Sequence, residues 1–403
     1  MTEQLVEMLL QPSTRTQESP IDPSPAWRKL QDSAPVHRVE LPDGHYAWIL
    51  TDYRLMRSVL ADHKRFSSRY ELWHLPFPFI EEGGALPPAV VGDPSGIDPP
   101  HHSRIRQAVA GKFTVRRMQL LTERIQKSTF EHLDAMGLLN PPVDLVKVFA
   151  EAIPSLMICE LLAIPDERRE EFLAQARTVM SWDVSLEERG AAHMAVHEYL
   201  TSLVVDKRAD PTDDMLSDLA GTELTVDEVA GFCAFLLGAG MDTTSNMIAT
   251  GMLVLLENPD QLAALRSDPT LINDAVEELL RYLSVADMSF RTAMEDVELD
   301  GRTIKAGETL VFSLAVGNRD PKKYPDPDRL DLHRKPSGHL AFSHGVHQCL
   351  GQQLARVTMR VAIPALLERF PSLRLAVSAE EIPMRTRENI YGVWNLPVTW
   401  DAE

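Results

Sequence analysis

Residues 342–351, F-S-H-G-V-H-Q-C-L-G, place one cysteine among two histidines and two glycines. Leu350 and Leu354 open a helical pattern directly after this segment, so Cys349 lies at the predicted start of a helix. Free N–H groups and the positive end of the helix dipole favour a thiolate over a thiol at such a position. A thiolate held there could ligate iron.

Two other interpretations stay open from these residues alone. Most free cysteines are buried apolar residues, and Cys349 could be one of them. Zinc is the other, with His344, His347 and Cys349 as ligands and His339 as a fourth. These ligand spacings match no standard zinc pattern and would crowd a tetrahedral site.

A second group that could do chemistry, Asp242 and Thr243, lies within a long predicted helix. That helix opens with a capping box from Thr225 to Glu228 and ends at Asn258, before a proline. The stretches on either side of Asp242 carry no charge. The central carboxylate and the capped ends favour a buried helix over a membrane span.

The remaining pattern predicts a mainly α fold with small β-sheets. In chain order, the predicted elements are a strand at 47–49, a helix at 52–60, an irregular proline-rich loop at 66–100, helices through most of 101–256 and a hairpin at 297–304.

The composition describes a folded, acidic protein. The 403 residues are 44% hydrophobic, which excludes disorder. Their net charge of −19 argues against nucleic-acid or anionic-membrane binding.

The first thirty residues lack a basic start and a continuous apolar stretch, so we expect neither a signal peptide nor a membrane anchor. Three scattered cysteines fit the reducing cytoplasm. We expect one domain, 1–403, with residues 1–25 as a flexible extension.

Three motifs together resemble the cytochrome P450 family. Residues 342–351, with Phe, Gly, Cys and Gly at relative positions one, four, eight and ten, are similar to its haem-binding loop. Residues 239–244, A-G-M-D-T-T, and the pair Glu278 and Arg281 follow the family order. An i,i+3 ion pair alone is worth only about 0.2–0.5 kcal/mol and is common by chance, so the conjunction carries the argument. The resemblance extends over residues 47–397, and the style is that of actinobacterial members that tailor natural products.

The resemblance implies a single-domain P450 fold with haem b buried between the long helix and the cysteine loop. It makes Cys349 the axial thiolate, with Phe342, Gly351 and Ala239 beside the haem. Buried propionates need cations, and the implied partners are His102, Arg106, Arg291 and His347. A structural ion network is implied for Glu278, Arg281 and Arg334.

Proton delivery is implied for Asp242 and Thr243. The alternative is that the Thr243 hydroxyl only bonds back to a helix carbonyl. Gly240 is expected to mark a helix bulge that admits oxygen and water. Ser343 departs from the family, whose soluble members usually have glycine there, and Met241 departs from a common histidine.

The implied reaction is hydroxylation or epoxidation of a bulky hydrophobic natural product, macrolide-like or polyketide-like, by O₂. Electrons would come from a separate ferredoxin and ferredoxin reductase, since no flavin or nicotinamide fingerprint is present. Two interpretations are open for the basic cluster of Lys112, Arg116 and Arg117. It could be the surface that binds the ferredoxin, or it could be an ordinary solvated helix face. Oxidative ring formation or coupling, and a haem sensor or carrier, are the alternatives.

The substrate pocket is the part of the site with the weakest sequence signal, because aromatic residues and Met at such positions are more often core than ligand contacts. We expect a monomer. The pocket residues implied by family position are Trp73, Phe77, Phe79, Leu236, Met288, Ile390 and Tyr391.

Overall fold

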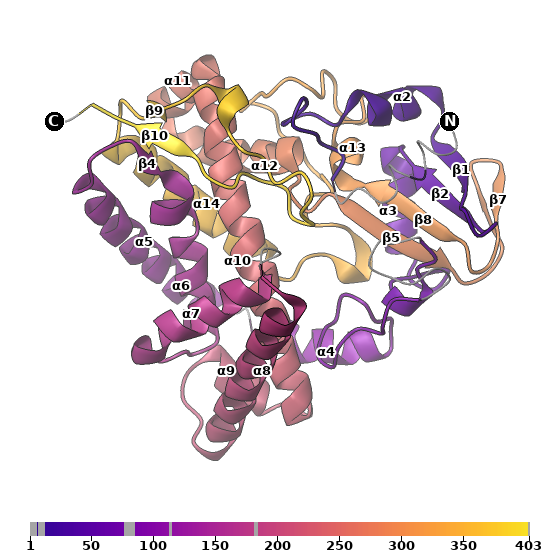
Figure 1. Ribbon diagram of the computed structural model, residues 1–403, viewed down its shortest axis with the longest axis horizontal. Helices are drawn as coiled ribbons and strands as arrows, with labels where there is room; N and C mark the ends of the chain where they lie inside the picture. Colours follow the sequence, from indigo (N-terminus) through magenta and orange to yellow (C-terminus); the bar gives the residue numbers. More distant parts are fainter. Residues whose placement is uncertain (1–5, 7–12, 76–84, 113–114, 181–183, 402–403) are drawn as a thin grey trace.

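The computed structural model describes residue 6 and residues 13–75, 85–112, 115–180 and 184–401. Most helices lie on one side and the largest sheet on the other, with α10 running between them (Figure 1). The α-helices are α2 Pro25–Ser33, α3 Tyr53–Ala61, α4 His101–Ala110, α5 Val115–Gly137, α6 Ala152–Leu161, α7 Asp166–Met180, α8 Leu186–Ala209, α9 Met215–Ala220, α10 Val226–Glu257, α11 Pro259–Ser267, α12 Ile272–Leu283, α13 Leu314–Asn318 and α14 Gln352–Arg369.

The predicted long helix is confirmed as α10. The Thr225 hydroxyl accepts a hydrogen bond from the Glu228 N–H at 3.1 Å, and the Glu228 carboxylate accepts one from the Thr225 N–H at 2.8 Å. This reciprocal pair is the predicted capping box. The helix ends one residue before Asn258, and nearly all of its second half is buried. The preference for a buried central helix is therefore confirmed.

The strands form three small sheets. The largest has the order β1-β2-β8-β5-β3, with β2 and β8 parallel and the other pairs antiparallel. The predicted strand at 47–49 lies in β2, and the predicted hairpin is the pair β6 and β7. The strands are β1 Val36–Glu40, β2 Tyr46–Leu50, β3 Phe66–Ser67, β4 Val143–Asp144, β5 Met288–Ala293, β6 Val297–Leu299, β7 Arg302–Ile304, β8 Thr309–Ser313, β9 Arg374–Leu375 and β10 Pro397–Thr399. Short helical turns lie at Tyr70–Leu72, Val146–Ala150, Pro269–Leu271, Gly345–His347 and Ala379–Glu381.

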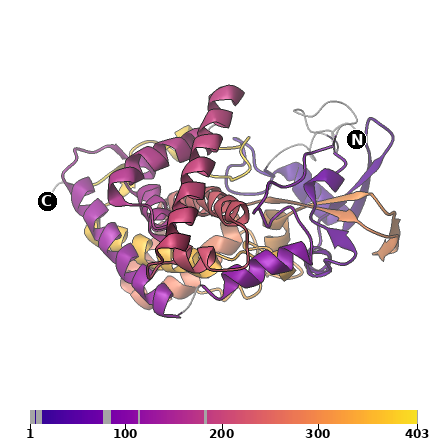
Figure 2. The ribbon, with the colours of Figure 1, turned by 90° about the horizontal axis from the view of Figure 1, so that it is seen from below.

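The central helix α10 is shared by two apolar clusters. Its second half packs with residues of α5, α6, α12 and α14, and its first half packs with residues of α6, α7, α8 and α9. Both α8 and α7 pack against α10. Figure 2 shows this part of the molecule from below. Because both faces of α10 are packed, the helix is a fixed platform for the residues at its middle.

Within the part of the chain that the structure describes, no single helix has the length and apolarity needed to cross a membrane. One pair, Val146–Leu161 with Asp166–Met180, meets those two criteria only when taken together across a bend of 117°.

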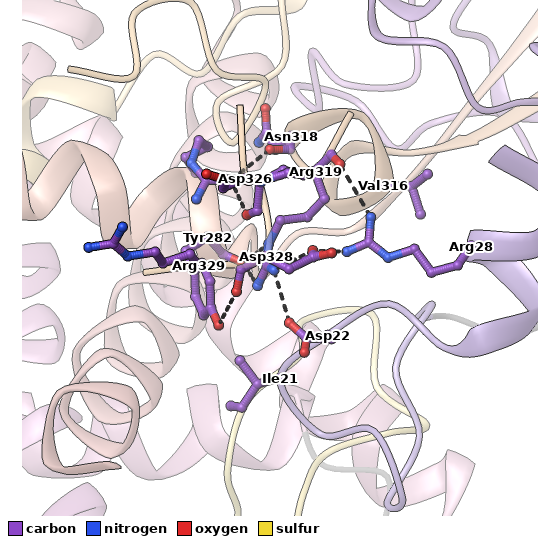
Figure 3. Close-up of polar contacts among 12 residues, drawn as sticks. Ile21, Asp22, Arg28, Tyr282, Val316, Asn318, Arg319, Asp326, Asp328 and Arg329 are labelled. Atoms are coloured by element: carbon purple, nitrogen blue, oxygen red, sulfur yellow. Dashed lines mark hydrogen bonds and ion pairs between the residues drawn. The ribbon is translucent and has the colours of Figure 1, made fainter. Parts of the chain in front are cut away.

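The expectation of a flexible N-terminal extension is wrong for residues 13–24. The Thr14 N–H donates to the Asp287 carboxylate at 2.7 Å, and Arg15 is buried with its guanidinium donating to the Leu283 carbonyl. Asp22 forms an ion pair at 2.9 Å with Arg319, which is fully buried (Figure 3). These contacts fasten residues 13–24 to the folded body. Residues 1–5 and 7–12 lie outside the described residues.

Candidate active site

The cysteine loop is closed by its own backbone and pinned to α3. The Cys349 N–H donates to the Phe342 carbonyl at 2.9 Å. Gly345 has a φ of +77°, and a Cβ at this residue would lie 2.2 Å from the Leu60 carbonyl oxygen at the end of α3. Only glycine fits there. The loop therefore holds Cys349 in one place relative to the sheet side of the molecule.

The backbone conformation at Ser343 shows why glycine is usual at this position in the family. Its φ is +58°, in the left-handed region, where a side chain costs of the order of 1 kcal/mol. Its N–H donates to the Leu340 carbonyl at 2.7 Å, which holds this conformation. Glycine is therefore the unstrained residue at this position, and serine is accommodated with strain.

The Cys349 thiol is accessible to solvent although protein atoms surround it on most sides. Burial raises the pKa of the thiol, while the N–H groups of Gly351 and Gln352 and the charges of Arg106 and Arg356 lower it. The net shift is upward. The expected stabilisation of the thiolate by the helix start is present, but desolvation outweighs it in the protein alone. A thiolate at Cys349 needs a further positive charge, and a metal ion bound to sulfur would provide one.

A cluster of buried and half-buried cationic and imidazole groups lies beside this loop. His102 of α4 and Arg291 of β5 are 2% and 7% exposed, and the His102 and His347 rings lie 4.2 Å apart. Burial, followed by the charges of Arg291, His102, Arg106 and His63, lowers the pKa of His347 to about 2. Burial likewise lowers the pKa of Arg291 to about 10. The groups thus crowd together without neutralising one another.

No carboxylate of the described residues forms an ion pair with His102, Arg106, Arg291 or His347. Nδ1 of His102 and Nε2 of His347 are buried without a hydrogen-bond partner. Arg106 donates to the Gln348 carbonyl in the cysteine loop. An anion would stabilise the charges of Arg106 and Arg291, and a neutral imidazole can donate a hydrogen bond to the same anion. The four residues fit a ligand with carboxylates, as the propionates of a haem would be.

The middle of α10 supplies the second half of the site. Ala239 is exposed although it lies within a mostly buried helix, and Thr243 is half-buried one turn further on. The Thr243 hydroxyl donates to the Ala239 carbonyl at 2.7 Å, which is the back-bonded alternative. That bond uses the hydroxyl proton and leaves the oxygen lone pairs free to accept.

Asp242 has a partner that sequence reasoning missed. Arg385 donates to both carboxylate oxygens, at 2.6 and 3.1 Å, and the Asn246 amide donates to one of them at 2.9 Å. The Trp394 ring lies 5.0 Å from the Arg385 guanidinium carbon. Arg385 is 143 residues from Asp242 in the chain, so no local pattern links them.

The bulge expected at Gly240 is wrong, because α10 is unbroken through this residue. A Cβ at Gly240 would lie 2.4 Å from the Cδ1 atom of Ile158 in α6. The glycine therefore allows two helices to pack closely, which explains its place in an apolar helix without any opening of the backbone.

The three residues of the predicted structural ion network are brought together. Glu278 and Arg281 are fully buried and form two hydrogen bonds of 2.8 Å, and Arg334 Nε lies 3.1 Å from the Glu278 carboxylate. Arg281 also donates to the Asn318 and Pro327 carbonyls at 2.9 Å. Every charge in this group meets a partner.

Six of the seven candidate pocket residues fall into three groups. Trp73 packs at 4.8 Å ring-centroid distance against both Tyr70 and Phe290. Leu236, Met288 and Ile390 are half-buried, whereas Phe77 and Phe79 lie outside the described residues.

Tyr391 does not fit a substrate contact. It is fully buried, its hydroxyl donates to the Pro20 carbonyl and its ring lies 4.8 Å from the Arg15 guanidinium carbon. Its role is to anchor the N-terminal segment, so its assignment to the pocket is wrong.

The basic cluster after α4 is partly neutralised within the chain. Arg116 forms an ion pair at 2.9 Å with Asp213, and Arg117 forms one at 2.6 Å with Asp218.

The interpretation of the cysteine loop as a zinc site finds no support in the structure. In the described part of the chain, the histidines of the loop and Cys349 do not form a group of three ligand atoms within 4.8 Å of one another.

An accessible cysteine just before α14, an exposed residue in the middle of α10 and a cluster of cationic and imidazole groups are the features that a haem-thiolate site requires. The family model for Cytochrome P450 matches residues 187–395. The chain belongs to the cytochrome P450 family, and it is a haem-dependent oxygenase.

Curated relatives and solved structures agree on this family. Cytochrome P450 105C1 of Streptomyces sp is 44% identical over 95% of this chain and 97% of the relative. Cytochrome P450 GfsF of Streptomyces halstedii is 44% identical over 96% and 95%. The crystal structure of CYP105P1 in complex with filipin I has a TM-score of 0.88 and 40% identity, covering 96% of this chain and 98% of that one. These neighbours confirm the predicted fold.

Proposed function

We propose that this chain is a haem-thiolate monooxygenase that hydroxylates or epoxidises a bulky hydrophobic natural product. Its co-substrate is O₂, and a ferredoxin with its reductase supplies two electrons. The single observation that carries the haem assignment is the group of His102, Arg106, Arg291 and His347, buried or half-buried and without an ion-paired carboxylate among the described residues, beside the accessible Cys349. The natural-product class is supported by relatives named PikC and Pentalenic acid synthase, both from Streptomyces.

In this proposal each group of side chains has one task. Cys349 holds the iron, the four cationic and imidazole residues bind the propionates, and Phe342, Gly351 and Ala239 lie beside the ring. The bound haem supplies the activation of O₂. Trp73, Phe77, Phe79, Leu236, Met288 and Ile390 line the substrate pocket. The cytoplasmic location, which the few scattered cysteines favour, and the monomeric state remain predictions.

Asp242 and Thr243 move protons in this proposal. The Thr243 hydroxyl donates to Ala239, so its oxygen is oriented to accept a hydrogen bond on its other side. The Asp242 carboxylate, held by Arg385 and Asn246, passes a proton only after an Arg385 bond loosens. Arg385 therefore sets the position of the Asp242 carboxylate in the relay.

The test of the haem-thiolate assignment is the absorption spectrum of the dithionite-reduced protein under carbon monoxide. We expect the red-shifted Soret band that a thiolate ligand produces. Cys349→Ser should abolish that band, whereas Cys233→Ala, at a buried cysteine of α10, should keep it. An unshifted band in the unchanged protein, or a shifted band in Cys349→Ser, would refute the assignment.

Proton delivery is tested by the peroxide released per electron consumed during turnover. Thr243→Ala should raise this ratio by about 10-fold or more, in line with the usual contribution of a positioned proton donor. The neighbouring, buried Thr244→Ala is the control and should leave the ratio unchanged. Equal ratios in both variants would assign the relay to other groups and reopen the sensor or carrier alternative. A product that has lost two hydrogens and gained no oxygen would instead indicate oxidative coupling.

A further inference from the structure

Three metal-ligating side chains meet outside the haem site, at the turn between β1 and β2. Asp43, His45 and His74 each bring one ligand atom, and these atoms all lie within 4.8 Å of one another. Among the residues that the structure describes, no other group of three or more His, Cys, Asp or Glu side chains meets this criterion. The group takes no part in the proposed oxygenase chemistry.

The turn fixes two of the three ligands. The Asp43 carboxylate accepts a hydrogen bond from the His45 N–H at 3.0 Å. The Leu41 N–H donates to the His45 carbonyl at 2.8 Å, the Gly44 N–H donates to the Leu41 carbonyl at 3.0 Å, and Gly44 has a φ of +84°. The side chains of Asp43 and His45 therefore project from a tight, hydrogen-bonded turn whose backbone needs glycine at its tip.

The third ligand is held from the other side by the sheet. The His74 N–H donates to the Thr309 hydroxyl of β8 at 2.9 Å, and the Leu72 carbonyl accepts a hydrogen bond from Thr292 of β5 at 2.9 Å. Nε2 of His74 lies 2.6 Å from the Asp43 carboxylate, and the His45 and His74 rings lie 3.9 Å apart. The three ligands thus come from two segments that are anchored independently.

We propose that Asp43, His45 and His74 form a binding site for a divalent transition ion of the Zn²⁺ or Ni²⁺ type. Two imidazoles and one carboxylate suit these borderline ions, whereas Mg²⁺ and Ca²⁺ prefer all-oxygen sites. The side chains are 30%, 63% and 34% exposed, so water can reach the ion and complete its coordination. The ion replaces the hydrogen bond that now joins His74 to Asp43.

A bound ion would fasten residues 72–75 to the β1–β2 turn. That segment includes Trp73, which packs against Phe290 of β5, the neighbour of Arg291. Occupancy of the site therefore stiffens the wall of the molecule that leads to the haem pocket without supplying a ligand to it. The expected effect is on stability and substrate affinity and not on the haem spectrum.

The experiment is a calorimetric titration of the haem-loaded, full-length protein with ZnCl₂ and NiCl₂, and with MgCl₂ and CaCl₂ for comparison. We expect one Zn²⁺ or Ni²⁺ per chain at this site, a rise in Tm with either ion, and no response to Mg²⁺ or Ca²⁺. His74→Ala and Asp43→Asn should each weaken Zn²⁺ binding by about 10-fold or more and remove the rise in Tm. His193→Ala, at an exposed histidine of α8, is the matched control and should bind as the unchanged protein does.

The proposal is overturned if Zn²⁺ binds no more tightly to the unchanged protein than to His74→Ala, or if His193→Ala weakens binding as much as His74→Ala does. If His74→Ala fails to fold, His45→Ala replaces it, because His45 is the most exposed of the three ligands. The haem spectrum under carbon monoxide is recorded for every variant. It shows that any loss of metal binding is separate from a failure of the proposed oxygenase site.

Discussion

Two buried charged regions of this molecule differ in one respect. Around Glu278, each charge meets an opposite charge or a carbonyl, and the pair with Arg281 is completely removed from solvent. Around Arg291, which is also buried, the cationic groups meet no carboxylate of the described residues within ion-pair distance. The first region is neutralised within the chain, whereas the second would need an anionic ligand, which the propionates supply in our proposal. In our proposal, pairing within the chain therefore distinguishes charges that stabilise the fold from charges that bind the haem.

The largest effect is expected in the paired region. Glu278→Ala leaves Arg281 buried without its carboxylate and should lower the free energy of unfolding by about 3–5 kcal/mol. Urea unfolding of the haem-free protein measures this. The double variant Glu278→Leu with Arg281→Met is the control and should recover part of the loss, since no fully buried lone charge remains and the partly exposed Arg334 keeps its carbonyl partners. A double variant that is as unstable as Glu278→Ala would mean that the pair does more than neutralise itself.

Arg291→Leu should act in opposite directions in the two forms of the protein. Without haem it removes a buried cation that has no carboxylate partner, so the free energy of unfolding should stay equal or rise. With haem it should speed loss of the cofactor by about 10-fold or more, since a charge-assisted hydrogen bond is worth about 1.5–3 kcal/mol. Transfer of haem to an acceptor protein measures the rate. Destabilisation of the haem-free form would mean that Arg291 belongs with the paired region.

The pH dependence of stability should show a third difference, at Glu277. Burial alone would raise the pKa of this carboxyl, but hydrogen bonds and charges from His339 and Arg356 outweigh it and lower the pKa to about 2. Its contribution is therefore fully present above pH 4.5, the ordinary pKa, and is lost as pH falls toward 2. Glu277→Gln should lower Tm at neutral pH, and the difference in Tm should shrink steadily below pH 4.5. A constant difference would contradict the lowered pKa.

The smallest effect is expected where a buried cation has two acidic partners. Arg319 pairs with both Asp22 and Asp328 at 2.9 Å, and both acids are about half exposed. Asp22→Asn should therefore lower the free energy of unfolding by no more than about 1 kcal/mol, which thermal unfolding can resolve. A loss as large as that of Glu278→Ala would show that Asp22 holds the N-terminal segment almost alone.

Local patterns in the sequence predicted much of this molecule. The capping box at Thr225, the turn at Gly301 and the i,i+3 pair of Glu278 and Arg281 all act within a few residues, so spacing reveals them. Partners far apart in the chain were not predictable in this way. Arg385 reaches Asp242 from the C-terminal segment, and Asp213 and Asp218 neutralise Arg116 and Arg117 from a distant part of the chain.

Packing at single residues was equally hidden. Gly240 and Tyr391 have residue types that suggest a bulge and a substrate contact, but each is determined by one neighbour, Ile158 or Pro20. The residue type limits the chemistry of a side chain, but the neighbours of that side chain are determined by the fold. The cationic cluster was predicted through family resemblance, because its members come from α4, β5 and the cysteine loop.

The contact between Thr14 and Asp287 spans 273 positions, and Arg15 reaches Leu283 across 268. Ribosomes deliver the amino end first, at about 5–20 residues per second, so these residues emerge long before the surface that receives them exists. During synthesis the beginning of the chain must remain undocked until α12 and β5 have been made. The N-terminal segment can therefore attach only after most of the chain has been translated and the surface around Leu283 and Asp287 has folded.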